Sequence, residues 1–134
     1  MTQRWRDWLD QAEHDLEHAA ASKCDGRHAW ACFASHQAAE KAVKALHVAG
    51  GKRLTGNVIT RLLTELPETP PEDLVDRGRV LDNYYIPTRS PRSHADGAAY
   101  EHYGALQSEQ GLRFAGDILQ FVRQALARDS ISNQ

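Results

Sequence analysis

The feature that most constrains this chain is an alanine-rich segment over residues 30–49, in which apolar side chains recur every three or four residues. This is the spacing of one face of an α-helix. Alanine side chains are small, so a neighbouring helix can approach closely, and Gly50 and Gly51 at the end of the segment are typical of a helix C-terminus. The apolar positions are Trp30, Phe33, Ala34, Ala38, Ala42, Ala45, Leu46 and Ala49.

The same periodicity predicts four more helices. We expect Thr2 to be the N-cap of a helix over residues 2–23, and Asn57 to be a cap of a short helix over residues 59–66. Prolines separate the later segments, and no segment alternates for long enough to indicate a β-strand. We therefore predict an all-α fold, an up-and-down bundle of four or five helices. The four additional segments are residues 2–23, 59–66, 72–84 and 100–127.

Length and composition favour one domain. The chain has 134 residues and is 41% hydrophobic, enough to form a core without disulfides. We assign residues 1–128 to a single helical domain and residues 129–134 to a frayed polar tail. Neither a signal peptide nor a membrane span is evident, so we expect a cytoplasmic protein. Cys24 and Cys32 are expected to be reduced and partly buried, with a disulfide as the less favoured alternative.

The net charge of −2 excludes an overall positive field that would attract nucleic acid, so any RNA site must be local. One local pattern, His14-Asp15-Leu16-Glu17-His18, matches the H-x-x-E-H motif of inverted zinc peptidases. Histidines four residues apart share a helix face and can bind one metal ion. No third ligand is evident downstream, so we interpret the motif as a solvated polar face and predict no metal site.

A second polar pattern lies beside the alanine stripe. Gln37, Glu40, Lys41 and Lys44 follow helical spacing and so share a face that is partly basic. One interpretation is a solvated face with a Glu-Lys ion pair, which contributes little to stability. The other is that Lys41 and Lys44 contact phosphate groups.

The strongest candidate for chemistry is the loop from Tyr84 to His94, which combines arginines, a histidine, tyrosines and hydroxyls between prolines. A guanidinium group matches a phosphate with a planar set of donors, and a histidine can exchange protons at cellular pH. Arg89 and His94 could therefore cleave RNA, with the 2′-hydroxyl as nucleophile and without a metal ion. The alternative is an ordinary surface loop in which Arg89 caps a helix C-terminus and His94 is idle.

Two separated motifs resemble the HEPN family of prokaryotic helical domains. Residues 30–46 contain the run Gln37-Ala38-Ala39-Glu40-Lys41-Ala42-Val43-Lys44-Ala45-Leu46, which is similar to the family's Q-A-A-E-K-A-x-K-A-L sequence. Residues 81–89 contain Tyr85-Ile86-Pro87-Thr88-Arg89, which resembles its Y-x-P-T-R turn. The resemblance covers roughly residues 4–127, with the motifs in the family's order.

The resemblance implies a helical bundle that dimerises and that pairs with a minimal nucleotidyltransferase as a toxin-antitoxin system. Active members of the family are RNases that need no metal or other cofactor and carry an R-x4-6-H motif. Arg89 and His94, with four residues between them, satisfy this spacing. Two departures are the Ser90-Pro91-Arg92 segment, where this branch commonly has Tyr-Pro-Asp, and Asp96, where relatives silenced by nucleotide attachment carry a tyrosine.

Two functions remain open on the sequence alone. In the first, a homodimer is a metal-independent endoribonuclease with Arg89 and His94 as catalytic residues. In the second, the same bundle binds a nucleotide or a nucleotidyltransferase partner without cleaving RNA. A purely structural helical adaptor is the remaining possibility. The residues predicted to bind RNA or nucleotide are Lys41, Lys44, Tyr85 and Arg92.

Overall fold

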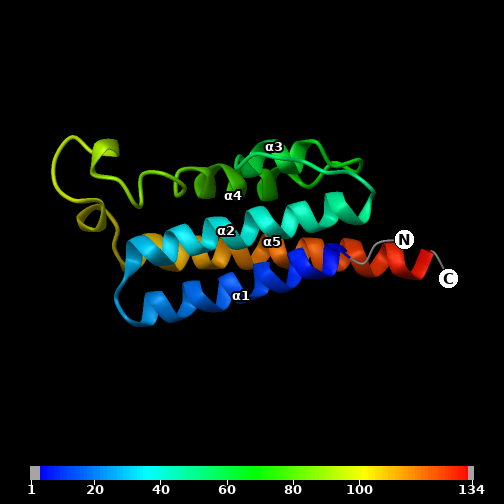
Figure 1. Ribbon diagram of the computed structural model, residues 1–134, viewed down its shortest axis with the longest axis horizontal. Coiled ribbons are helices and arrows are strands. Elements are labelled where there is room, and N and C mark those ends of the chain that lie inside the picture. Colours follow the sequence, from blue (N-terminus) through cyan, green and yellow to red (C-terminus); the bar gives the residue numbers. More distant parts are fainter. Residues whose placement is uncertain (1–3, 133–134) are drawn as a thin grey trace.

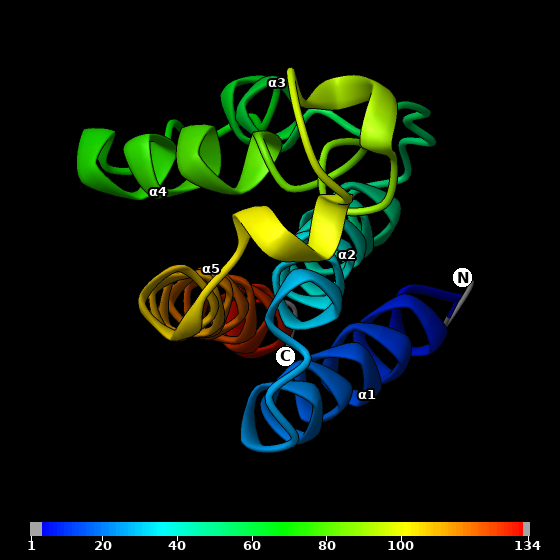
Figure 2. The ribbon, with the colours of Figure 1, turned by 90° about the vertical axis from the view of Figure 1, so that its left-hand side faces the viewer.

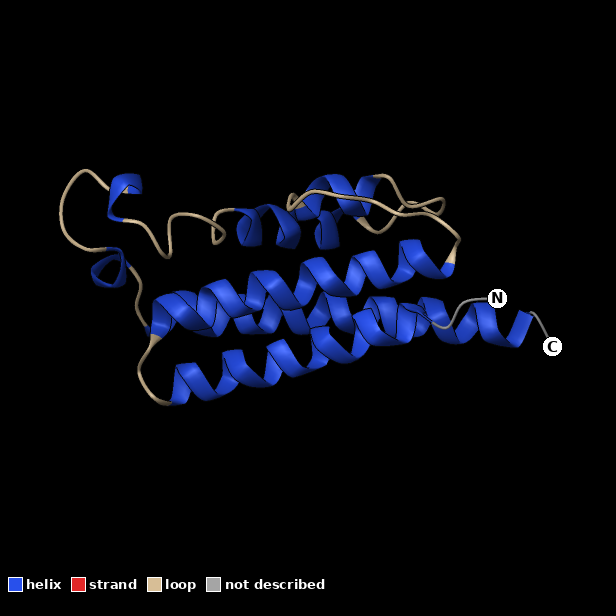
Figure 3. Cartoon of the chain, in the orientation of Figure 1, coloured by secondary structure: helices blue, strands red, loops and turns tan. Residues whose placement is uncertain are grey.

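The computed structural model describes residues 4–132. These residues form only helices and loops, as Figure 3 shows, which confirms the predicted all-α bundle. The elements in chain order are α1 (Arg4–Cys24), α2 (His28–Ala49), α3 (Ile59–Thr64), α4 (Glu72–Asp82), the short 3-10 helices η1 (Pro91–Ser93) and η2 (Ala99–His102), and α5 (Ala105–Ser132).

Helix α2 lies at the centre of the bundle. The long helices α1 and α5 pack against it and against each other, whereas α3 and α4 cover another side (Figures 1 and 2). The loop that carries η1 and η2 projects at one end of the molecule, and α1 begins and α5 ends at the opposite end (Figure 1). The candidate loop is thus held near the start of α2 and the start of α5.

Most of the predicted alanine stripe is buried, whereas the residues at its two ends, Trp30 and Ala49, are exposed. Helix α2 has helices on more than one side, so its small side chains are enclosed nearly all around, and close packing of this kind gives a dense core. Larger aliphatic side chains from α3, α4 and α5 complete this core. The fully enclosed positions include Ala38, Ala39, Ala42, Val43, Ile59, Leu63, Leu81, Ile118, Leu119 and Val122.

The start of α3 differs from the prediction. Asn57 does not cap the helix. The N-cap residue is Val58, whose side chain contains no hydrogen-bond acceptor. The Asp82 carboxylate performs this role from the end of α4, because it accepts hydrogen bonds from Ile59 N at 2.6 Å and Thr60 N at 3.2 Å. Helix α4 accordingly ends at Asp82 rather than at Tyr84.

The last helix begins later and ends later than predicted. Residues from Tyr100 to His102 form part of η2, and α5 starts at Ala105 because Gly104 N donates to Gln107 Oε1 at 2.7 Å, as in a capping box. The helix runs past the predicted end at residue 127 to Ser132. The predicted cap at Thr2 lies outside the described residues.

The remaining expectations concern cysteines, metals and membranes. Cys24 is exposed and Cys32 is buried, and both thiols are free. Burial raises the pKa of the Cys32 thiol to about 12, so this thiol stays protonated and unreactive. Within residues 4–132 no three His, Cys, Asp or Glu side chains cluster as metal ligands. Over the same residues, none of the helices is both long and apolar enough to cross a membrane.

Candidate functional site

The Arg89 side chain is exposed but fixed in place. Its guanidinium carbon lies 4.1 Å from the ring centroid of Phe33 and 4.9 Å from that of Tyr85. Arg89 Nε donates to Tyr85 O at 3.0 Å. No described carboxylate forms an ion pair with Arg89, so its terminal nitrogens are available to a phosphate group held outside the loop.

His94 is bonded to the same turn. Its Nε2 lies 2.6 Å from Pro87 O, and because a carbonyl oxygen only accepts, Nε2 carries a hydrogen and donates it. The half-buried ring of His94 stacks on the ring of His102 at 4.0 Å between centroids. No pattern in the sequence singled out His102.

The structure therefore brings Arg89 and His94 to one turn. Arg89 donates a hydrogen bond to Tyr85 O, and His94 donates one to Pro87 O, two residues further along the chain. In the same turn, Thr88 Oγ1 donates to Tyr84 O at 3.0 Å. The alternative in which Arg89 caps a helix C-terminus is only partly correct, because Tyr85 lies beyond the end of α4. His94 is not idle in the loop either, because its ring holds the Pro87 carbonyl.

Sequence reasoning also missed His36, which lies completely buried behind Tyr85. Its ring centroid is 5.1 Å from that of Tyr85, and its Nε2 donates to Asn57 O at 2.9 Å. Gln37 Nε2 lies 3.1 Å from the other ring nitrogen, which accepts its hydrogen. The only local signal was that His36 follows Phe33 by three residues and so shares its helix face.

His36 is neutral in this environment. Burial lowers its pKa from the usual 6.5, and the hydrogen bond to the Asn57 carbonyl and the negative charge of Glu40 only partly oppose this effect. A neutral imidazole packs against an aromatic ring without an unpaired buried charge. His36 therefore supports Tyr85, which in turn supports Arg89.

The polar face of α2 contains the predicted Glu-Lys ion pair, but it is only partly solvated. Glu40 is buried, and its Oε1 lies 2.8 Å from Lys44 Nζ, whose side chain is only 12% exposed. Lys41 Nζ lies 2.6 Å from Asp15 Oδ2 on α1. Both lysines thus contact residues of the bundle, and the structure does not bring them to Arg89 and His94.

Tyr85 and Arg92, the other predicted contacts, do lie in the candidate loop. Tyr85 is half-buried, with its ring between His36 and Arg89. Arg92 is exposed in η1, where its backbone N–H donates to Ser90 Oγ at 3.3 Å. Of these two side chains, only that of Arg92 extends from the loop into solvent.

Large apolar side chains are exposed at this end of the molecule. Trp30 at the start of α2 is 51% exposed and Ile86 in the candidate loop is 54% exposed. The side chains of Tyr100 in η2 and Leu106 at the start of α5 are more exposed than these two. Trp30 contacts Phe33, on whose ring Arg89 lies, and Ile86 belongs to the same loop as Arg89. Exposed apolar side chains beside a candidate site are typical of an interaction surface.

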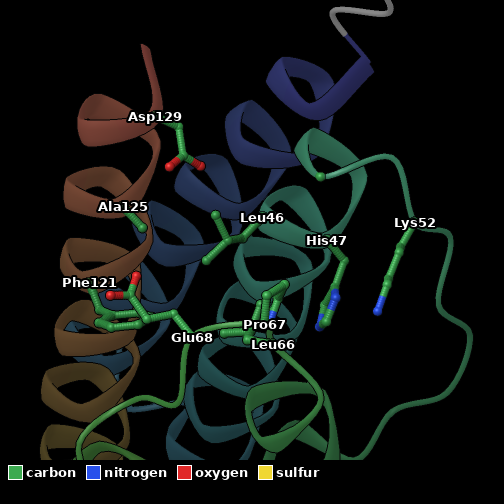
Figure 4. A pocket seen from close by; sticks show the side chains of 10 residues that line it. Leu46, His47, Lys52, Leu66, Pro67, Glu68, Phe121, Ala125 and Asp129 are labelled. Atoms are coloured by element: carbon green, nitrogen blue, oxygen red, sulfur yellow. The ribbon is translucent and has the colours of Figure 1, made fainter. Parts of the chain in front are cut away.

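A cavity of about 170 Å³ lies at the other end of the molecule (Figure 4). It is formed by the C-terminal parts of α2 and α5 and by the segment after α3. None of the predicted site residues lines it. The residues around the cavity are Leu46, His47, Gly50, Lys52, Leu66, Pro67, Glu68, Phe121, Ala125 and Asp129.

Comparisons with known proteins agree with this architecture. TT1696 from Thermus thermophilus is 51% identical, with a TM-score of 0.90 over 92% of this chain and 98% of that one. ST0689, an archaeal HEPN homologue, is 39% identical, with a TM-score of 0.80 over 92% and 98%. An HEPN domain protein from Thermotoga maritima, TM0613, is 33% identical, with a TM-score of 0.74 over 91% and 98%.

No curated protein matches the chain. The model of the HEPN domain family, however, matches residues 5–125, which is nearly the whole described bundle. Both motifs from which the resemblance was drawn, in α2 and in the turn after α4, lie inside this range. The chain therefore belongs to the HEPN domain family.

Proposed function

We propose that this HEPN protein is a metal-independent endoribonuclease of toxin-antitoxin type that acts on cytoplasmic RNA as a homodimer. The observation that carries the proposal is the position of Arg89. Its guanidinium group is held against Phe33 and Tyr85 while no described carboxylate neutralises it. A fixed, unneutralised guanidinium can stabilise charge that develops on a phosphate without reorganising during the reaction.

His94 supplies the proton chemistry in this proposal. The RNA 2′-hydroxyl attacks the adjacent phosphorus, the bond to the 5′-oxygen breaks, and a 2′,3′-cyclic phosphate is left. His94 Nδ1, which makes no hydrogen bond within residues 4–132, takes the proton from the 2′-hydroxyl or gives one to the leaving oxygen. Arg89 and Arg92 bind the phosphate from the same loop.

A homodimer is supported by the exposed apolar groups around the site. Burying Trp30 and Ile86 against a second copy would remove apolar area from water and place two Arg89 side chains near one interface. We expect Trp30→Glu to make the protein monomeric in sedimentation experiments. Val58→Glu is a matched control, because Val58 is 52% exposed but lies at the start of α3. A dimer that survives Trp30→Glu unchanged would exclude this interface.

The test of the activity is incubation of purified protein with total cellular RNA in EDTA. We expect wild type to cleave RNA and leave cyclic phosphate ends, and His94→Ala to lose at least about 100-fold in rate. His14→Ala is the control, because His14 is exposed on α1. A folded, dimeric wild-type protein that leaves RNA intact would contradict the proposal.

Binding without cleavage is the second candidate. The hydrogen bond from His94 Nε2 to Pro87 O favours it, because one of the two ring nitrogens is already occupied. In that case the loop would hold a nucleotide phosphate, or a minimal nucleotidyltransferase acting as the antitoxin partner. His94→Ala would then leave the affinity for nucleotide or partner nearly unchanged, whereas Arg89→Ala would weaken it.

A further inference from the structure

His102 is paired with His94 by ring stacking. The two rings are parallel within 4° and their centroids lie 4.0 Å apart. The chain returns on itself between them at Gly97, whose φ of +80° belongs to the left-handed region that favours glycine. The backbone of the loop therefore places one histidine directly over the other.

The hydrogen bonds of the two rings are equivalent. His94 Nε2 lies 2.6 Å from Pro87 O, and His102 Nε2 lies 2.5 Å from Asp96 O. Because both partners are carbonyl oxygens, both Nε2 atoms carry hydrogens. Each ring is thus held by one nitrogen, and its Nδ1 makes no hydrogen bond to any part of the chain that the structure describes.

Few charged groups lie against the pair. Tyr103 meets the His94 ring edge-on at 5.9 Å between centroids. On the other side, a Cβ placed on Gly97 would collide with the Glu101 carboxylate and would lie 3.4 Å from His102 Nε2, so both of these side chains fold over Gly97. None of the ion pairs within residues 4–132 joins Glu101 to either ring. Because the two rings are in contact, a second positive charge on the pair would repel the first.

We infer that His102 is the proton-transfer partner of His94, with one ring neutral and the other protonated in the active state. This inference rests on the proposed RNA cleavage. The neutral ring accepts the proton of the 2′-hydroxyl as the bond from O2′ to phosphorus forms. The protonated ring donates its proton to O5′ as the bond from phosphorus to O5′ breaks, so the pair keeps its single charge. Proton exchange with water then returns each ring to its starting protonation state.

The experiment compares His94→Gln with His102→Gln on two RNA substrates in EDTA. A glutamine amide can still donate to the Pro87 or Asp96 carbonyl, but it cannot transfer protons. One substrate is ordinary RNA, and the other has sulfur in place of the 5′-bridging oxygen, so its leaving thiolate needs no proton. We expect both variants to cleave ordinary RNA at least about 100-fold more slowly than wild type. His14→Gln, a change of the same kind on α1, should cleave at the wild-type rate.

On the sulfur substrate we expect one variant to recover to near the wild-type rate, which identifies the lost ring as the acid. Recovery of neither variant would overturn the division of roles. If His102→Gln cleaves ordinary RNA at the wild-type rate while His94→Gln is inactive, the role of His102 as proton-transfer partner is rejected. The proposed function is then unaffected. An inactive wild type would instead reject the proposed function itself. Thermal unfolding checks that the variants are folded, and His94→Asn or His102→Asn replaces the glutamine variant at the same position if that variant is not.

Discussion

The carboxylate of Asp82 accepts a hydrogen bond from the backbone N–H of Ile59 at 2.6 Å, and so the last residue of α4 caps the first turn of α3. Thr60 adds two more hydrogen bonds to the same carboxylate, from its N–H at 3.2 Å and from its hydroxyl at 2.6 Å. The end of α4 leads directly into the turn that carries Arg89. The cap therefore fixes the start of that turn against the bundle.

We expect Asp82→Ala to lower the free energy of unfolding by about 2 kcal/mol, because the N–H groups at the start of α3 lose their acceptor. The measurement is urea unfolding followed by circular dichroism. Asp10→Ala is the control, because Asp10 is exposed on α1, and it should change the free energy by no more than about 0.5 kcal/mol. Equal effects of the two substitutions would show that the cap contributes nothing to stability.

Replacement of Arg89 by lysine should separate activity from stability. Lysine keeps the charge, but its ammonium group cannot lie flat against the Phe33 and Tyr85 rings and has no fixed planar set of donors. We expect Arg89→Lys to reduce RNA cleavage by about 100-fold or more and to change the free energy of unfolding by only about 1 kcal/mol. Arg113→Lys is a matched control, because Arg113 lies 5.6 Å from the Phe114 ring centroid. Cleavage by Arg89→Lys at the wild-type rate would contradict the proposed role.

The ion pair between Glu40 and Lys44 predicts a structural role for Lys44. Loss of Lys44 leaves the buried Glu40 carboxylate without a partner, so Lys44→Ala should destabilise the protein by about 3 kcal/mol. The double variant Glu40→Leu/Lys44→Met should be much closer to wild type, because it removes both charges. Urea unfolding of the three proteins gives the comparison. If Lys44→Ala changes the free energy of unfolding little but binds RNA poorly, the prediction that Lys44 contacts phosphate would be supported instead.

His36 makes stability depend on pH. Its pKa is lowered in the folded protein, chiefly by burial, so between that pKa and 6.5 the unfolded chain binds a proton that the folded chain does not. The contribution of His36 is fully present above pH 6.5 and decreases as the pH falls below it. We expect the free energy of unfolding to fall from about pH 7 to about pH 5, and to fall less in His36→Gln. A His14→Gln control should follow wild type, and a His36→Gln curve parallel to wild type would exclude this role.

Much of the fold could be predicted from the sequence, because helical periodicity depends on neighbours three and four residues apart. The alanine stripe predicted α2 up to Ala49, and the prolines separated the helices that follow. The α2 motif and the turn at Arg89 pointed to the family for the same reason, since each is continuous in the chain. The spacing of Arg89 and His94 identified the loop, although not the contacts that its side chains make.

Contacts between distant segments were decided only by the tertiary structure. The spacing of Glu40, Lys41 and Lys44 defined one helix face, but it could not show that α1 packs beside that face and that Glu40 is buried. The same holds for His36 behind Tyr85 and for His102 over His94, because no local pattern brings either pair together. Periodicity determines which residues share a face of one helix, whereas packing determines what that face meets, and burial and charge at the site follow from packing.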